Sequence, residues 1–201
     1  MNRINKPSAI LALMIGIALA LAGCKPAGPA AEPPLAGAAI GGDFALTASD
    51  GRTVRWADFA GKYRVVYFGY AFCPDVCPTD MQRVAQGLKT LKASDPDKAA
   101  KITPIFITID PERDTAKVVG EFAAAFSPDI IGLTGTPEQI AATAKAFKVF
   151  YQKGAAVEGG GYLVDHSNIV YLFGPAGEPL ATLPVDQGAD AVAAELDQWV
   201  S

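Results

Sequence analysis

The chain has 201 residues, of which 50% are hydrophobic, 9% aromatic and 19% charged. This length accommodates one domain with a sizeable core, and the composition excludes a chain that is disordered throughout. The formal net charge of −4 leaves no basic excess to bind phosphates, so nucleic acid is excluded as an expected partner.

The first 23 residues are predicted to be a secretory signal peptide rather than part of the fold. Arg3 and Lys6 precede an apolar run at 9–22, which is shorter than the roughly 20 residues of a membrane-spanning helix. An uncleaved membrane anchor is the alternative. The LAGC sequence at 21–24 resembles the bacterial lipobox, which implies cleavage before Cys24 and lipidation of that cysteine.

Residues 24–40 are predicted to form a tether between the lipid and the domain. This segment is rich in alanine, proline and glycine and offers little with which to build a core. Such a composition is typical of a semi-extended linker. The folded domain is therefore expected to span residues 41–201.

The domain is predicted to begin with a short β-hairpin, followed by a buried strand and a helix. Residues 43–47 and 53–55 flank a turn at 49–52. Residues 63–70 are aromatic and β-branched with almost no charge, which is typical of a buried central strand. The segment CPDVCPTD comes next, and the apolar spacing after it predicts one buried helix face, at Met81, Val84, Leu88 and Leu91.

Strands and helices then alternate toward the C-terminus. The predicted elements are a strand at 102–109, a helix from Asp114 or Thr115 to Phe126, a strand at 130–133, a helix at 137–147, a glycine loop at 159–161, strands at 168–173 and 179–183, and a helix at 190–200. This alternation predicts parallel pairing, with a late hairpin that adds antiparallel edge strands. We therefore predict an α/β domain with a mixed central sheet flanked by helices. A cysteine motif between the first buried strand and its helix suggests a thioredoxin-like fold.

Cys73 and Cys77 lie four residues apart at the junction between that strand and that helix. Because a helix N-terminus favours negative charge, both thiols are expected to lean toward the thiolate, the form that binds metals and attacks disulfides. The alternative is a purely structural disulfide. Closing so short a loop would stabilise the fold by only about 2 kcal/mol, which is a weak reason to place a disulfide there.

His166 is the single histidine of the chain and precedes a predicted buried strand. A lone histidine is more often a satisfied structural residue than a ligand. In a thioredoxin-like topology, however, this loop faces the cysteine-bearing end of the helix. Asp165-His166-Ser167 also stands where thioredoxin-type enzymes, by resemblance, have a cis-proline. A neutral imidazole facing two thiolates makes a Cys2His metal site, and Asp165 is a candidate acceptor that would orient its ring.

The donor set favours copper over zinc. Two soft sulfurs and one nitrogen suit copper(I), which accepts three ligands, and they accommodate copper(II) with an added ligand. Zinc also accepts these donors, but closed structural zinc sites usually have four protein ligands. Met81 lies on the predicted buried face of the helix, which excludes a methionine-rich copper site.

Three segments in this order resemble the signature blocks of the SCO/SenC family: YFGYAFCPDVCPTD at 67–80, ITIDPERDT at 107–115 and YLVDHSNIVYLFGPAGE at 162–178. The members of this family are membrane-tethered, thioredoxin-like copper chaperones for cytochrome c oxidase assembly. The resemblance implies that Cys73, Cys77 and His166 bind copper as Cu(I) and Cu(II). It also implies that Asp165 and Asp75 support the site.

A second pair of residues, Asp110 and Arg113, matches the middle block of the family. They have two interpretations that the sequence leaves open. They form either a turn and helix cap after the strand at 102–109 or a part of the site.

The resemblance implies a metallochaperone, for which no enzymatic activity is expected, that delivers copper to the copper A centre of cytochrome c oxidase. Its partners would be the copper A-bearing subunit and other periplasmic copper carriers or thiol reductants. A lipid anchor would hold it to a bacterial membrane, by family function the cytoplasmic one, with the domain facing the periplasm.

Two alternative functions use the same cysteines. The first is a membrane-tethered thiol–disulfide oxidoreductase that reduces the copper-ligand cysteines of the oxidase subunit. It would need Cys73 and Cys77 but not His166. The second is a peroxiredoxin-like peroxidase, which is disfavoured because such enzymes have threonine at the position of Tyr70.

Overall fold

The computed structural model describes residues 31–156 and 161–201, and Pro33–Ser201 form one compact unit. The predicted signal peptide and residues 24–30 of the predicted tether, Cys24 among them, lie outside the described residues. No helix among the residues described is both long and apolar enough to cross a membrane.

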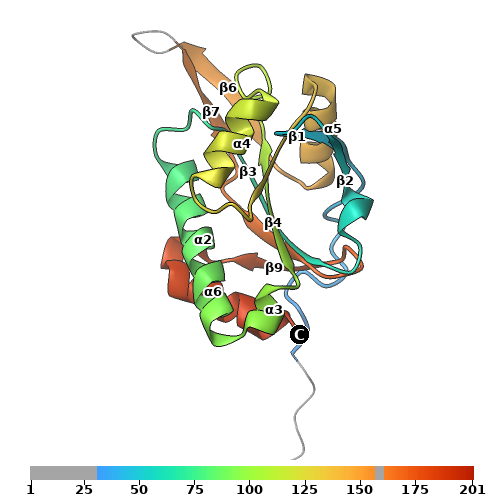
Figure 1. Cartoon of the computed structure of the whole chain (residues 1–201). Helices are drawn as coiled ribbons and strands as arrows, with labels where there is room; N and C mark the ends of the chain where they lie inside the picture. The colour runs from blue at the N-terminus through green and yellow to red at the C-terminus, as the bar shows by residue number, and fades with distance from the viewer. Residues whose placement is uncertain (1–30, 157–160) are drawn as a thin grey trace, which may run out of the picture. The chain divides into compact units, whose positions relative to one another are not determined.

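A seven-stranded mixed sheet forms the centre of the domain (Figure 1), with the strand order β2-β1-β5-β4-β3-β8-β9. Strand β3 pairs in parallel with β4 and antiparallel with β8, while β1 pairs antiparallel with both β2 and β5. The predicted fold class is therefore confirmed, including the N-terminal hairpin. The strands are β1 (Ala45–Ala48), β2 (Thr53–Arg55), β3 (Tyr63–Gly69), β4 (Ile102–Thr108), β5 (Ile131–Thr134), β8 (Val170–Phe173) and β9 (Pro179–Leu183).

The helices flank this sheet. They are α2 (Val76–Ser94), α3 (Pro96–Ala99), α4 (Ala116–Ala124), α5 (Pro137–Ala146) and α6 (Ala189–Trp199), with short 3-10 helices η1 (Trp56–Phe59) and η2 (Val185–Gln187). Helix α2 packs directly against α6. This approach is close because Gly87 has no side chain: a Cβ there would lie 2.5 Å from a methyl carbon of Val192.

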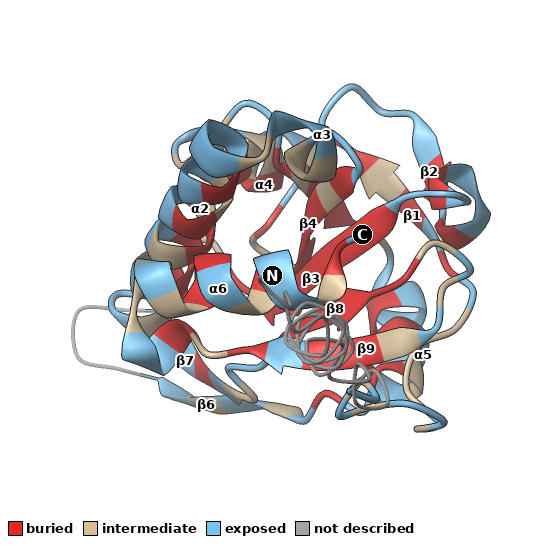
Figure 2. Cartoon of the chain, turned by 90° about the horizontal axis from the view of Figure 1, so that it is seen from below, coloured by how far each residue is buried: buried red, intermediate tan, exposed pale blue. Residues whose placement is uncertain are grey.

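The core lies on and around β3, whose seven residues are all buried. Strand β8 is also buried at every residue and β4 at all but Thr103, as the predominance of apolar residues in their sequences predicts. Figure 2 shows this buried centre, with exposed residues along the outward side of α2. A rigid sheet therefore carries the loop that follows β3, which contains the two cysteines.

A separate two-stranded sheet, β6 (Tyr151–Ala156) and β7 (Tyr162–His166), was not predicted from the sequence. Tyr151 pairs with His166, so the histidine ends a strand rather than lying in a loop. The sequence of β6 is YQKGAA, and its residues are exposed or half-buried. Such a strand lacks the alternation of apolar and polar residues by which a strand is recognised in a sequence.

The compact unit begins at Pro33, earlier than the predicted boundary at residue 41. Leu35 N–H donates to the Leu180 carbonyl at 2.9 Å, and Gly41 N–H donates to the Ala146 carbonyl at 3.1 Å. Leu35 and Ile40 pack against the core as partly buried side chains. Residues 33–40, predicted to belong to the tether, therefore belong to the compact unit.

Candidate metal centre

The two cysteines lie where strand β3 passes into helix α2. Cys73 is in the connecting loop and Cys77 is in the first turn of α2, as predicted. Both are free thiols and both are buried, Cys77 completely. Cys77 N–H donates to Cys73 Sγ at 3.4 Å, so the sulfur in the loop lies against the N-terminus of the helix.

Gly69, the last residue of β3, provides the space that Cys77 occupies. A Cβ at Gly69 would lie 2.9 Å from Cys77 Sγ, 3.0 Å from the Tyr67 ring and 3.1 Å from the Phe106 ring. The Cys77 sulfur therefore packs directly on the main chain of the central strand. Its position is set by the most buried part of the sheet.

His166 completes a group of three candidate ligands. Its Nε2 lies 3.3 Å from Cys77 Sγ, and one ligand atom from each of Cys73, Cys77 and His166 lies within 4.8 Å of the others. The imidazole packs edge-on against Tyr67 and Tyr70, with ring centroids 6.3 and 5.9 Å away. Residues that are far apart in the sequence thus converge on one point.

The orientation of the imidazole is set by Ser167 rather than by Asp165. His166 Nδ1 lies 2.9 Å from the Ser167 carbonyl. A carbonyl only accepts hydrogen bonds, so the proton is on Nδ1 and Nε2 presents its lone pair toward the sulfurs. The partner of Nδ1 is thus the Ser167 main chain and not the Asp165 carboxylate that the sequence suggested. Side chains alternate along β7, and Asp165 points to solvent between buried Val164 and half-buried His166.

Asp75 also lies at the surface. It is the N-cap residue of α2, but its carboxylate makes no capping hydrogen bond; its main-chain carbonyl accepts from the Thr79 hydroxyl at 3.0 Å. Asp75 and Asp165 both line the cleft beside the cysteines. They therefore place negative charge at its mouth and make no hydrogen bond to the three candidate ligands.

Burial opposes ionisation of Cys77. Desolvation raises the pKa of the Cys77 thiol, so the prediction that both thiols lean toward the thiolate is wrong for this cysteine. The helix N-terminus is present, but removal of water from the thiol outweighs it. A bound metal cation would supply the positive charge that stabilises the thiolate, with release of the proton.

Two residues beneath the thiols were not identified from the sequence. Tyr67 O–H donates to Asp80 Oδ2 at 3.1 Å, and both side chains are buried. Burial raises the pKa of both groups. The sequence spacing could have identified Asp80, because it lies three residues after Cys77 and so shares the buried face of the helix.

The site opens to solvent through a cleft of about 430 Å³. Cys73 and His166 are among the residues that line it, whereas Cys77 lies below them and is fully buried. Leu163 also lines the cleft and is 44% exposed, and Phe72, next in the sequence to Cys73, is 54% exposed. A metal ion bound by the three residues would therefore be accessible to solvent or to a partner from the side of Cys73 and His166.

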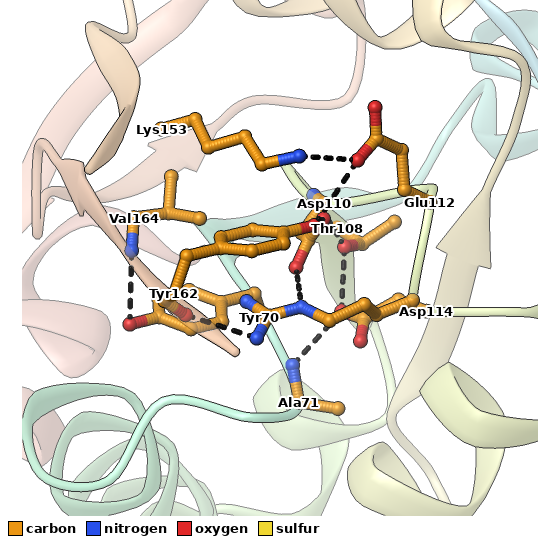
Figure 3. A network of polar contacts seen from close by, with 10 residues as sticks. Tyr70, Ala71, Thr108, Asp110, Glu112, Asp114, Lys153, Tyr162 and Val164 are labelled. Atoms are coloured by element: carbon orange, nitrogen blue, oxygen red, sulfur yellow. Dashed lines mark hydrogen bonds and ion pairs between the residues drawn. The ribbon is translucent and has the colours of Figure 1, made fainter. Parts of the chain in front are cut away.

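The segment after β4 contacts the cysteine loop (Figure 3). Asp114 is completely buried, and its Oδ2 accepts from Ala71 N–H at 2.8 Å and from the Thr108 hydroxyl at 2.6 Å. Thr115, not Asp114, caps helix α4, by accepting from Val118 N–H at 3.3 Å. Asp110 and Arg113, for which two interpretations were left open, form a turn after β4: the Asp110 carbonyl accepts from Arg113 N–H at 3.2 Å and from Asp114 N–H at 2.9 Å, and neither residue belongs to the group of three candidate ligands.

The family model described as SCO1/SenC matches residues 32–201. The chain is 42% identical over 145 residues to the mitochondrial SCO1 homolog 1 of Arabidopsis thaliana, covering 72% of this chain and 42% of that protein. It is 45% identical over 143 residues to the protein SenC of Rhodobacter capsulatus, covering 70% and 61%. The chain thus spans about half the length of the curated relatives it matches.

A solved structure supports the same assignment. The crystal structure of Arabidopsis thaliana ScoI with copper bound is 38% identical and superposes with a TM-score of 0.72, covering 80% of this chain and all of that chain. The family match extends over the whole compact unit, including both cysteines and the histidine. The chain belongs to the SCO1/SenC family.

Proposed function

We propose that this protein binds one copper ion through Cys73, Cys77 and His166 and delivers it to the copper A centre of cytochrome c oxidase. The observation that carries this proposal is the convergence of two thiols and one imidazole nitrogen within 4.8 Å at the floor of an open cleft. The copper-bound structure of the Arabidopsis relative supports copper as the metal.

The chemistry of the donors fits copper better than zinc. The site has only three donors, and two of them are soft thiolate sulfurs. Both properties suit copper(I). Within the part of the chain that the structure describes, no further cysteine or carboxylate joins these three residues as a fourth ligand. Structural zinc, in contrast, usually has four protein ligands. Copper(II) would complete its coordination with a further ligand, for which the cleft has room.

Delivery of copper requires that the ion can leave. Cys73 and His166 line the open cleft, while Cys77 lies on the main chain of β3 and is covered by protein. We infer that an acceptor exchanges ligands first at Cys73 and His166 and last at Cys77. The copper A-bearing subunit would be that acceptor, and other periplasmic copper carriers or thiol reductants would prepare the site.

A second candidate function rests on the proximity of the two free thiols. Cys73 Sγ lies against the Cys77 main chain, and both sulfurs belong to one group within 4.8 Å. A dithiol in this arrangement can reduce a disulfide of a partner, and it then forms a Cys73–Cys77 disulfide. This reaction requires no ligand from His166.

The variant His166→Ala separates the two functions. We expect it to weaken copper(II) binding by at least about tenfold, because even loss of a residue that supports a metal ligand costs that much. Copper(I) binding should fall less, since imidazole nitrogen is a harder donor than thiolate sulfur. Titration of the full chain in detergent with each copper ion, with metal analysis of the loaded protein, measures both.

The control for that variant is thiol exchange. His166→Ala should leave Cys73 and Cys77 able to react with small disulfides, because this reaction depends on the thiols and their accessibility. If the variant binds both copper ions like the wild type and supports normal oxidase assembly while cysteine variants do not, the oxidoreductase function would replace the chaperone function.

We further propose that Cys24 carries a lipid that anchors the mature protein to the bacterial membrane, with the domain in the periplasm. The LAGC sequence after a short charged and apolar segment supports this. We expect the intact mass of the membrane-extracted protein to correspond to a chain that begins at a lipidated Cys24. A mass that corresponds to an unmodified chain from Met1 would contradict the prediction.

A further inference from the structure

The strand that carries His166 is not part of the central sheet. Among the residues that the structure describes, β7 pairs with β6 alone, and together they form a two-stranded sheet. The other edge of β7 binds side chains instead of a strand. Arg113 Nη1 donates to the Tyr162 carbonyl at 2.9 Å, and Val164 N–H donates to the Tyr70 hydroxyl at 3.3 Å. Tyr162 and Val164 are two residues apart, so these groups lie on one edge of the strand.

Arg113 joins this edge to the turn after β4 and to the cysteine loop. Its Nε donates to Asp110 Oδ2 at 2.5 Å, and its guanidinium lies over the Tyr162 ring at 3.7 Å. The guanidinium also lies 5.2 Å from the Phe72 ring, in the cysteine loop. A planar group with several donors is suited to bind a carboxylate, a carbonyl and aromatic faces at the same time.

The remaining contacts of the hairpin reinforce the same attachment. The Tyr162 hydroxyl donates to Asp110 Oδ1 at 2.7 Å, and Lys153 Nζ lies 2.6 Å from Glu112 Oε2. The Lys153–Glu112 pair is exposed and contributes little. Asp110 is only 4% exposed, so its bonds with Arg113 and Tyr162 are the ones shielded from water.

The same short segment also fixes the cysteine loop. Asp114, next to Arg113, holds Ala71 N–H two residues before Cys73. Arg113 holds Tyr162 on the strand that ends at His166. The loop between β4 and α4 therefore binds both the cysteine loop and β7, the two segments that carry the candidate ligands.

We propose that Arg113 is a positioning residue for the copper site, which fixes β7 against the cysteine loop and so sets the position of His166 over the two thiols. The inference rests on the proposed binding of copper by these residues. Arg113 does not contact the metal in this proposal; it acts through the strand. Four residues of extended chain, about 13 Å, link its contact at Tyr162 to His166.

The test compares Arg113→Ala with Arg113→Lys, in the full chain titrated with copper(II). We expect the alanine variant to bind about tenfold more weakly, as when a residue that supports a metal ligand is lost. The lysine variant should fall between alanine and wild type, because it keeps the charge but not the planar set of donors. Lys117→Ala, which removes an exposed partner of Glu121 on α4, is the matched control and should bind like the wild type.

A double-mutant cycle distinguishes positioning from a general loss of structure. In the His166→Ala background, Arg113→Ala should cause no further loss of copper affinity, because the residue through which it acts is absent. Equal losses in both backgrounds would overturn the proposal, and so would wild-type affinity of Arg113→Ala. If Arg113→Ala does not fold, the same cycle is run with Arg113→Lys.

Amide hydrogen exchange of the metal-free protein provides a readout that does not depend on copper. Arg113→Ala should speed exchange in 151–156 and 162–166, while strand β3 keeps its protection. Unchanged exchange in the hairpin would contradict the attachment. If the wild type binds no copper, the proposed function fails, and hairpin exchange still reports whether Arg113 holds β7.

Discussion

Replacing either Cys73 or Cys77 with serine is expected to lower copper(I) affinity by about 10²–10³-fold. The scale comes from structural zinc sites, in which four ligands together supply about 10–16 kcal/mol, or roughly 3–4 kcal/mol each. Serine is nearly the same size as cysteine but offers a neutral, hard hydroxyl where a soft thiolate is needed. The fold should survive, because both side chains are small.

Competition with a chromogenic copper(I) chelator under reducing conditions measures this effect in the detergent-solubilised full chain. Cys24→Ser is the matched control, because it makes the same substitution outside the three proposed ligands and should leave the affinity unchanged. Oxidation of the wild type to a Cys73–Cys77 disulfide should block binding as well, since no thiolate is then available. Binding by either serine variant as tight as that of the wild type would refute the ligand assignment.

The second large effect is expected from Gly69→Val. A Cβ at this position would already lie 2.9 Å from Cys77 Sγ and 3.0 Å from the Tyr67 ring, and valine adds two methyl groups. Overpacking in a core costs up to about 3 kcal/mol, which for a domain of this size lowers Tm by about 6–12 °C. Cys77 Sγ must also move away from its place beside His166 Nε2, so copper affinity should fall.

Thermal unfolding of the metal-free protein, followed by circular dichroism, measures the change in Tm. Competition with a copper chelator measures the change in copper affinity. Gly69→Ala should show a smaller loss in the same direction. In Gly135→Ala the added Cβ would meet Gln139 Oε1 at 2.9 Å and a Leu46 methyl carbon at 3.0 Å, the ends of flexible side chains rather than two packed rings and a buried sulfur, so this variant should lose less stability than Gly69→Ala. A Gly69→Val protein with the Tm and copper affinity of the wild type would show that the close contact has no consequence.

The local part of the site could be predicted from the sequence. The buried strand before the cysteines and the apolar face of the helix after them follow from residue type and spacing, and the structure has them as β3 and α2. Cys73 in the loop and Cys77 in the first helical turn follow from the same junction. These features depend on residues close together in the chain, where sequence patterns are most informative.

The surroundings of His166 could not be predicted in the same way. The strands of its hairpin are mostly exposed, and their partners lie in other segments, as the contact between Arg113 and Tyr162 shows. The carbonyl that orients the imidazole belongs to Ser167, and main-chain acceptors leave no mark in a sequence. Residues 33–40 read as linker by composition, although Leu35 and Ile40 pack on the core.

The assembly of the site from distant parts of the chain has a consequence for biosynthesis. Cys77 and His166 are 89 positions apart, and their meeting requires β7 to be attached beside the finished sheet. At a synthesis rate of about 5–20 residues per second, the thiols precede the histidine by about 4–18 s. The emerging chain therefore carries both thiols before it carries the imidazole. Its three-donor site exists only after the C-terminal part has folded, so loading with metal has to follow folding.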